Sequence, residues 1–126
     1  MRYKKDISPL SPVLHRVKDV SAYTYTWDTG KYPDRGFTDA RQLGFIAQEI
    51  MQSFPELVLT DTSGYMSVDY AKMSVVLLQG VKEQQDEILR LRTELDDLKK
   101  ESDRKFTSLE QQIVLLTELV HSAFPR

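Results

Sequence analysis

Three basic residues near the start of the chain are the first group that could do chemistry. Arg2, Lys4 and Lys5 lie within the first five positions, and no apolar run follows them. A lysine can act as the general base for a serine nucleophile when burial or a neighbouring cation lowers its pKa, because only the neutral amine accepts a proton. The first serine, Ser8, precedes a proline and is poorly placed as a nucleophile. Composition alone therefore favours a solvated terminus over a catalytic site.

Other kinds of chemical site are excluded by residue type. The chain has no cysteine, so it holds neither a disulfide nor a thiolate metal site. Its two histidines, His15 and His121, lack the spacing of metal ligands. Gly44, in LGFIAQE, lacks the further glycines of a phosphate-binding loop. We therefore expect no metal, no cofactor and no small-molecule ligand.

The overall charge argues against polyanionic partners. The 126-residue chain has a formal net charge of -2 and an isoelectric point near 5.7, so no global positive field attracts nucleic acid or an anionic membrane. No stretch approaches the length of about 20 apolar residues that a membrane span needs, and the first residues lack the apolar centre of a secretory signal. Neither nucleic acid nor a membrane is expected as a partner.

An aromatic strand is the clearest local element of the first half. Tyr23, Tyr25 and Trp27 alternate with threonines at the period of two that puts the aromatic rings on one face. Such a face could be a stacking platform for bases or sugars. Beside a small core, however, aromatic residues more often belong to that core, and this is the interpretation we favour. Residues 29–40 contain the glycines and proline of an exposed loop.

The remaining pattern of residues 1–70 predicts a small α+β unit. Apolar spacing over residues 13–20 indicates a helix of about two turns, and Gly44 precedes a second helix that Pro55 ends. A two-stranded hairpin follows, with Gly64 supplying the positive φ of its turn. About three short strands are expected, and the core they form is too small to make the unit stable on its own. This unit needs support from elsewhere.

That support is predicted to come from a long helix over residues 71–126, which Asp69 could cap. Thirteen positions in the helix are spaced by alternating fours and threes, as in a heptad seam. They are Leu77, Val81, Gln84, Ile88, Leu91, Leu95, Leu98, Ser102, Phe106, Leu109, Ile113, Leu116 and Val120. Two successive fours around Ser102 form a stutter. At 1.5 Å per residue the helix is about 80 Å long, which is too long to fold back onto the small α+β unit of residues 1–70.

An oligomeric parallel coiled coil is the expected use of this seam, because a solitary helix would leave a long apolar stripe in water. The alternative is an antiparallel hairpin bending at KKESDRK, but no glycine or proline marks a bend there. β-Branched residues such as Val81 and Ile88 fall at a, and leucines such as Leu91 fall at d. The seam alone therefore leans toward two strands.

Four segments of the chain, taken together, resemble one known family. RYKKDI, RQLGFIAQEIMQSFPELV, GYMSVDYAKM and LLQGVKEQQDEI occur in this order between Arg2 and Ile88. They resemble the intramolecular chaperone autoprocessing domain, which ends bacteriophage endosialidases, tail spikes and tail fibres and also occurs in myelin regulatory factor. Within these segments the resemblance assigns structural motif positions to Gly44, Phe45, Ile46, Ala47, Gln48, Glu49, Asp69 and Tyr70.

The resemblance implies a C-terminal folding aid. Such a domain forms a homotrimer, brings three copies of an upstream fibrous or β-helical domain into register, and then releases itself by self-cleavage. The implied fold is a small α+β head followed by a long helix in a parallel trimeric coiled coil. The implied location is a virion tail fibre or spike precursor, assembled in the host cytoplasm if the source is a phage. We expect a trimer, because three fibre chains and a globular collar can override a weak seam preference.

The resemblance also gives the basic opening a possible role. The cleavage motif of the family reads Ser-Asp-x-Arg-x-Lys, with the bond broken just before the serine, the serine as nucleophile and the lysine as its base. On this sequence Arg2 falls on the arginine and Lys4 on the lysine, so the serine and aspartate positions lie before Met1. The chain as given is therefore expected to be unable to cleave itself.

Two other functions remain open at this stage. The chain could be a plain coiled-coil adapter whose head binds another protein without any peptidase activity. It could also be an oligomerised carbohydrate-binding head that uses the face of Tyr23, Tyr25 and Trp27. A Ser-Asp before Met1 together with a repetitive β-rich upstream region would favour the chaperone function over the adapter. Glycan binding that is lost in Trp27→Ala while the trimer persists would favour the carbohydrate-binding head.

Overall fold

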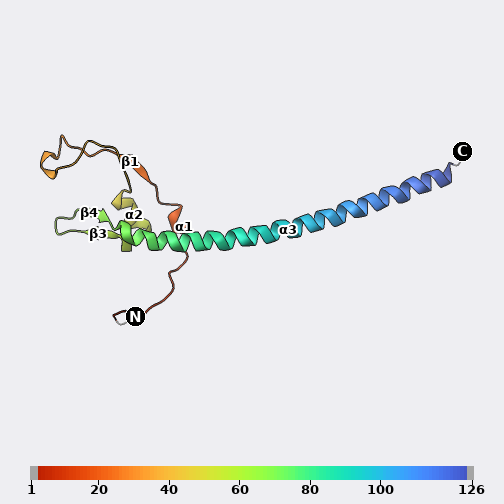
Figure 1. Ribbon diagram of the computed structural model, residues 1–126, viewed down its shortest axis with the longest axis horizontal. Helices are drawn as coiled ribbons and strands as arrows, with labels where there is room; N and C mark the ends of the chain where they lie inside the picture. The colour runs from red at the N-terminus through yellow and green to blue at the C-terminus, as the bar shows by residue number, and fades with distance from the viewer. Residues whose placement is uncertain (1–2, 125–126) are drawn as a thin grey trace. The chain divides into compact units, whose positions relative to one another are not determined.

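A computed structural model describes residues 3–124 and divides the chain into two compact units, residues 1–84 and 85–126. Within the described residues, four short strands and short helical segments precede one long helix (Figure 1). In chain order the elements are α1 (Leu14–Val17), β1 (Tyr23–Tyr25), the 3-10 turn η1 (Pro33–Arg35), β2 (Gln42–Gly44), α2 (Ala47–Ser53), the 3-10 turn η2 (Pro55–Leu57), β3 (Val58–Thr60), β4 (Met66–Val68) and α3 (Tyr70–Ala123). The α+β class and the long C-terminal helix predicted from the sequence are confirmed.

The core of the first unit joins segments from both ends of that unit. Helix α2 buries the positions that recur on one of its faces, and Pro55 ends it as predicted. The start of α3 contributes two residues to the same core, so the head does draw support from the long helix. The buried core cluster is Val13, Ile50, Phe54, Leu57, Met73 and Val76.

Helix α1 is shorter than predicted, with one turn in place of about two. A single arginine on it links α1 to α2. Arg16 donates its Nε–H to the carbonyl oxygen of Ser53 at 2.8 Å and pairs with the Glu56 carboxylate at 2.8 Å. The guanidinium also lies 4.1 Å from the centre of the Phe54 ring. This residue therefore fixes α1 against the core.

The strands form two separate antiparallel pairs. β1 pairs with β2, with Tyr23 opposite Gly44, and β3 pairs with β4, with Val58 opposite Val68. The expectation of three strands was wrong, because the extended piece at residues 42–44 pairs with the aromatic strand. An isolated two-stranded ribbon is marginal in water, and the β3–β4 pair obtains its packing from α2.

The aromatic residues of the β1 region do not belong to the buried core, so that prediction was also wrong. Tyr23 is 36% exposed, and Tyr25 and Trp27 are only half-buried. The Trp27 ring stacks on Phe37 with 4.2 Å between centroids and 9° between planes, and Tyr25 meets it edge-on at 5.1 Å. These rings pack on one another and on the loop that follows the strand.

The turn between β3 and β4 is organised by one carboxylate. Asp61 Oδ1 accepts hydrogen bonds from the Ser63 backbone N–H at 2.8 Å, from the Ser63 hydroxyl at 2.6 Å and from the Tyr65 N–H at 2.9 Å. Gly64 has the predicted positive φ, +86°. The bonds from Ser63 and Tyr65 favour the ionised carboxylate and hold the pKa of Asp61 below its usual value.

We expect this turn to weaken in acid. Because the folded-state pKa of Asp61 is lowered, the stabilisation is present above the usual aspartate value of 3.8 and is lost as the pH falls through the lowered pKa. In an NMR titration, the Ser63 and Tyr65 amide shifts should move with a midpoint below 3.8, and Asp61→Asn should abolish that step. A midpoint at or above 3.8 would contradict this role of the carboxylate.

Candidate functional site

The candidate lysine lies on an exposed N-terminal arm, residues 3–12. Lys4 and Lys5 are both exposed, and Asp6 adopts a left-handed conformation with φ of 54°, a region that aspartate tolerates better than most residues. Arg2, the predicted motif arginine, lies outside the described residues. In the single chain the Lys4 amine is therefore not desolvated, and any burial of it has to come from other chains or segments.

The motif glycine is required by close packing. Gly44 is in β2, and a Cβ atom there would lie 2.7 Å from the Tyr70 hydroxyl oxygen and 3.1 Å from the Tyr25 ring. The next residue, Phe45, donates its backbone N–H to the same Tyr70 hydroxyl at 3.2 Å and stacks on the Tyr70 ring with 5.7 Å between centroids. Gly44, Phe45 and Tyr70, predicted as motif positions, are thus brought together.

The other motif positions divide between core and surface. Ala47 is buried in α2, whereas Ile46 is 43% exposed and Gln48 is exposed. The Glu49 carboxylate accepts a hydrogen bond from the Tyr23 hydroxyl, which lies 2.9 Å from both carboxylate oxygens. That bond ties α2 to the aromatic strand, so Glu49 serves the packing of the head.

Asp69 joins the β3–β4 hairpin to the long helix. Its Oδ1 accepts the backbone N–H of Lys72 at 3.2 Å, so the prediction that it caps α3 is confirmed. The Asp69 backbone N–H is donated to the carbonyl oxygen of Leu57 at 2.7 Å. The start of α3 is therefore fixed to the core through this residue.

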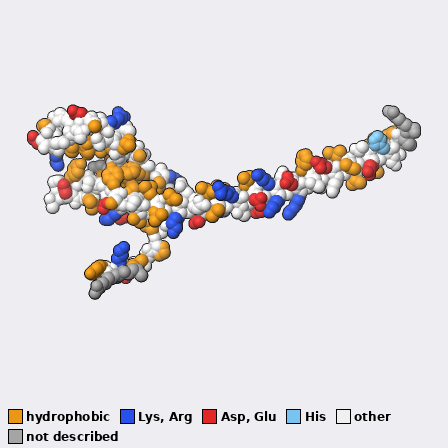
Figure 2. All heavy atoms as spheres, viewed as in Figure 1, with side chains coloured by type: hydrophobic (Ala, Val, Ile, Leu, Met, Phe, Trp, Pro, Cys, Tyr) orange, Lys and Arg blue, Asp and Glu red, His pale blue; other side chains and the backbone are white. Residues whose placement is uncertain are grey.

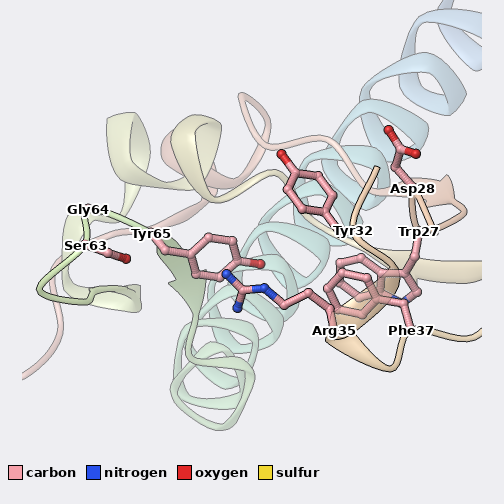
Figure 3. A pocket seen from close by; sticks show the side chains of 8 residues that line it. All are labelled: Trp27, Asp28, Tyr32, Arg35, Phe37, Ser63, Gly64 and Tyr65. Carbon is pink, nitrogen blue, oxygen red and sulfur yellow. The ribbon is translucent and has the colours of Figure 1, made fainter. Parts of the chain in front are cut away.

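A hollow of about 550 Å³ lies between the loop after β1 and the β3–β4 turn. In Figure 3 the Arg35 side chain extends between the Tyr65 ring and the stacked rings of Trp27 and Phe37. Its guanidinium lies 6.0 Å from the Tyr65 ring centre. The sequence did not indicate this hollow. Phe37 and Tyr65 lie far apart in the sequence, and no local pattern shows that the loop after β1 lies beside the β3–β4 turn. Its full lining is Trp27, Asp28, Tyr32, Arg35, Phe37, Ser63, Gly64 and Tyr65.

The predicted seam is a continuous row of exposed side chains on α3. Its leucines are about half exposed, for example Leu91 at 49% and Leu95 at 54%, and Gln84 and Ser102 are exposed as well. Figure 2 shows hydrophobic side chains recurring along the helix between charged ones. Helix α3 is unbroken through KKESDRK, so the bend considered as an alternative is absent.

Several charged residues of α3 pair with one another along the helix. Lys100 and Asp96 lie 3.0 Å apart, Lys105 and Glu101 lie 3.1 Å apart, and Arg90 pairs with both Glu87 and Glu94. These are the i,i+3 and i,i+4 pairs expected of a solvated helix surface. The seam positions from Leu77 to Val120 lie beside these pairs and are exposed in the single chain.

Over the part of the chain that the structure describes, no group of three or more His, Cys, Asp or Glu side chains is arranged to hold a metal ion. Within the same residues, no helix is long and apolar enough to cross a membrane. The features that remain for function are the arm with Lys4, the motif contacts around Gly44, the aromatic hollow and the apolar row of α3.

Comparison with known proteins gives a family match over the first part of the chain. Residues 1–59 match the model of a peptidase family described as Chaperone of endosialidase. The match confirms the resemblance drawn from the sequence and supports a chaperone role. It covers the arm with Lys4 and the positions from Gly44 to Glu49, whereas Asp69, Tyr70 and the seam lie beyond it. No curated protein matches the chain.

Proposed function

We propose that this chain, whose residues 1–59 match the chaperone of endosialidase family, is a C-terminal intramolecular chaperone that trimerises and aligns an upstream fibrous domain of its own precursor. The observation that carries the proposal is helix α3, 54 residues long, which begins in the core of the head and then presents an apolar heptad row to solvent. Residues 1–70 act as the chaperone head, and residues 71–126 act as the trimerisation segment.

The apolar row supports assembly on energetic grounds. Burying a leucine or isoleucine side chain stabilises by about 1.5–3 kcal/mol, and the row carries such residues along most of α3. One chain alone leaves this stabilisation unused. The motif residue Ile46 on the head is exposed as well, as are Leu77 and Leu78 near the start of α3. A trimer would cover both parts together.

Release of the chaperone is the second part of the proposal. Assembly would bury Lys4 and desolvate it, which favours the neutral amine. That amine would take the hydroxyl proton of a serine two residues before Met1. At the same time the serine Oγ would bond to the carbonyl carbon of the residue before the serine. The peptide C–N bond then breaks, its nitrogen receives the proton from Lys4, and water hydrolyses the resulting ester. Loss of the chaperone would trap the upstream domain kinetically.

The proposed function implies a precursor and a set of partners for the chain. The proposed precursor is of the tail fibre or tail spike type, assembled in the host cytoplasm if the source is a phage. The partners are two further copies of the chain and the upstream domain of the precursor. Self-cleavage can be studied in what we call the restored fusion, in which a folded upstream domain ends in Ser-Asp directly before Met1.

Sedimentation equilibrium of the chain tests the assembly. The mass of one chain is 14.6 kDa, and we expect about three times that mass, independent of loading concentration in the micromolar range. The reason is that three parallel copies of α3 bury the apolar row while the heads form a collar. A mass of two chains would contradict the trimer, and a mass of one chain would contradict the chaperone function as proposed.

A further inference from the structure

A hydrogen-bonded contact links Val13, the residue that follows the N-terminal arm, to helix α3 across 70 residues of sequence. The backbone N–H of Val13 is donated to the carboxylate of Glu83, with 2.9 Å to Oε1 and 3.0 Å to Oε2. Both residues belong to the first compact unit. A hydrogen bond to an ionised acceptor is stronger than one between neutral groups. The arm is thus joined to α3 at the point where it enters the core.

The Val13 backbone N–H requires a hydrogen-bond acceptor. Val13 is fully buried, and a buried N–H without an acceptor is unfavourable. The preceding residue, Pro12, has no N–H of its own, so the Val13 amide is the first donor that the chain offers on leaving the arm. The Glu83 carboxylate therefore fixes the plane of the peptide between Pro12 and Val13.

Two prolines restrict the backbone conformations of the arm. Pro9 and Pro12 lock their own φ angles, and each restricts the serine before it to extended conformations. Leu10 is 37% exposed, and the other residues from 3 to 12 are also exposed, so little packing in the single chain orients the arm. The peptide plane at Val13 therefore sets the direction in which the arm leaves the core.

Helix α3 receives the arm with two residues on one face. Gly80 and Glu83 are three positions apart, a spacing that places them side by side on the helix. Gly80 is buried, and the position of its absent Cβ atom lies 3.7 Å from Val13 Cγ2 and 3.7 Å from Leu14 Cδ2. Glu83 lies between the predicted seam positions Val81 and Gln84 and at a different point of the heptad, so its bond to the arm leaves the seam free.

We propose that Glu83 is a positioning residue for self-cleavage: its carboxylate orients the arm with respect to the seam helix and so sets where Lys4 is presented in the trimer. The inference rests on the proposed function. Glu83 acts through the backbone of Val13 and touches neither the reacting serine nor Lys4. Because α3 carries the seam, each of three assembled arms would have the same orientation relative to the coiled coil.

Variants of the restored fusion test the role of Glu83. Glu83→Ala removes the acceptor and should slow first-order self-cleavage by about tenfold to a hundredfold, the effect of a displacement of about 1 Å in a reacting group. Glu83→Gln keeps a carbonyl oxygen and should stay within about threefold of the unaltered rate by the same argument. Asp86→Asn is the matched control, since it removes a charge from the same helix three positions further on and should leave the rate unchanged.

A merely structural role would show itself in the assembly. Trimer mass and thermal midpoint are therefore measured for each variant, and the inference requires a slower cut at unchanged mass. Equal cleavage rates for Glu83→Ala and the unaltered fusion would overturn it. So would a loss of rate that Glu83→Gln does not recover.

Hydrogen exchange of the Val13 amide gives a result that does not depend on cleavage. In the chain itself, Glu83→Ala should speed this exchange at least about tenfold, and Asp86→Asn should not change it. Unchanged exchange in Glu83→Ala would overturn the inference whether or not the restored fusion cleaves. If the unaltered fusion fails to cleave while exchange responds as expected, the anchor at Val13 stands and the proposed self-cleavage is wrong.

Discussion

The restored fusion is expected to cut itself just before the added serine, and Lys4→Ala is expected to stop the cut. A positioned general base contributes about 100-fold to 10,000-fold to a rate, so the variant should lose at least about 100-fold. Alanine leaves no group at this position that can accept the serine proton. Gel electrophoresis gives the rate, and mass spectrometry of the released fragment gives the new N-terminus.

Lys5→Ala is the matched control for this experiment. Lys5 is the adjacent lysine, is also exposed in the single chain, and does not fall on the lysine of the cleavage motif. Its variant should cut at nearly the unaltered rate. Loss of cleavage in Lys5→Ala but not in Lys4→Ala would show that the motif is aligned in the wrong register. A restored fusion that stays intact as a folded trimer would favour a non-catalytic coiled-coil adapter.

Carboxylates placed in the seam are expected to take the assembly apart. In the double variant Leu95→Asp with Leu98→Asp, three copies of each carboxylate would lie in adjacent layers of the bundle. Each leucine lost from a packed core costs about 2–5 kcal/mol, and a buried unpaired charge adds to that cost. Sedimentation should give the mass of one chain, 14.6 kDa. Circular dichroism should show loss of helix, because a long helix without tertiary packing is marginal in water.

A second double variant separates the seam from the rest of the helix surface. Thr93→Asp with Lys100→Asp introduces the same number of carboxylates on either side of the seam layers, at exposed positions outside the heptad row. This variant should remain trimeric with most of its helix. If the seam variant keeps its mass, or if both variants dissociate alike, the apolar row is not what holds the chains together.

Local signals account for the parts of the fold that were predicted correctly. Gly64 and Asp61 mark the β3–β4 turn within a few residues, Asp69 caps the helix that begins at the next position, and Pro55 ends α2. The heptad row likewise repeats within one helix, so its exposed positions could be read without knowledge of any distant contact. Each of these features depends on neighbouring residues alone.

Contacts between distant residues account for what the sequence did not indicate. The bond between Val13 and Glu83 spans 70 positions, and the packing of Gly44 against Tyr70 depends on the meeting of β2 with the start of α3. The aromatic strand was assigned to the core because aromatic residues beside a small core usually belong to it. Alternation shows which rings share a face, but it does not show what covers that face. Phe37, in the loop, covers part of it.

Lys4 illustrates a different limit. The residue was singled out by its position in a motif, and the single chain leaves it exposed. Its proposed chemistry depends on burial by other copies and on a serine outside the chain. Neither condition is encoded in the residues that surround Lys4 in the sequence, which is why composition alone favoured a solvated terminus.

The rate of self-cleavage across a dilution series of the restored fusion tests most directly whether assembly triggers release. Trimer content is followed by sedimentation in the same samples, over concentrations that span dissociation. We predict that the initial rate rises and falls in proportion to the trimer and vanishes when only single chains remain. A first-order rate constant per chain that stays the same while the trimer dissociates would contradict the account.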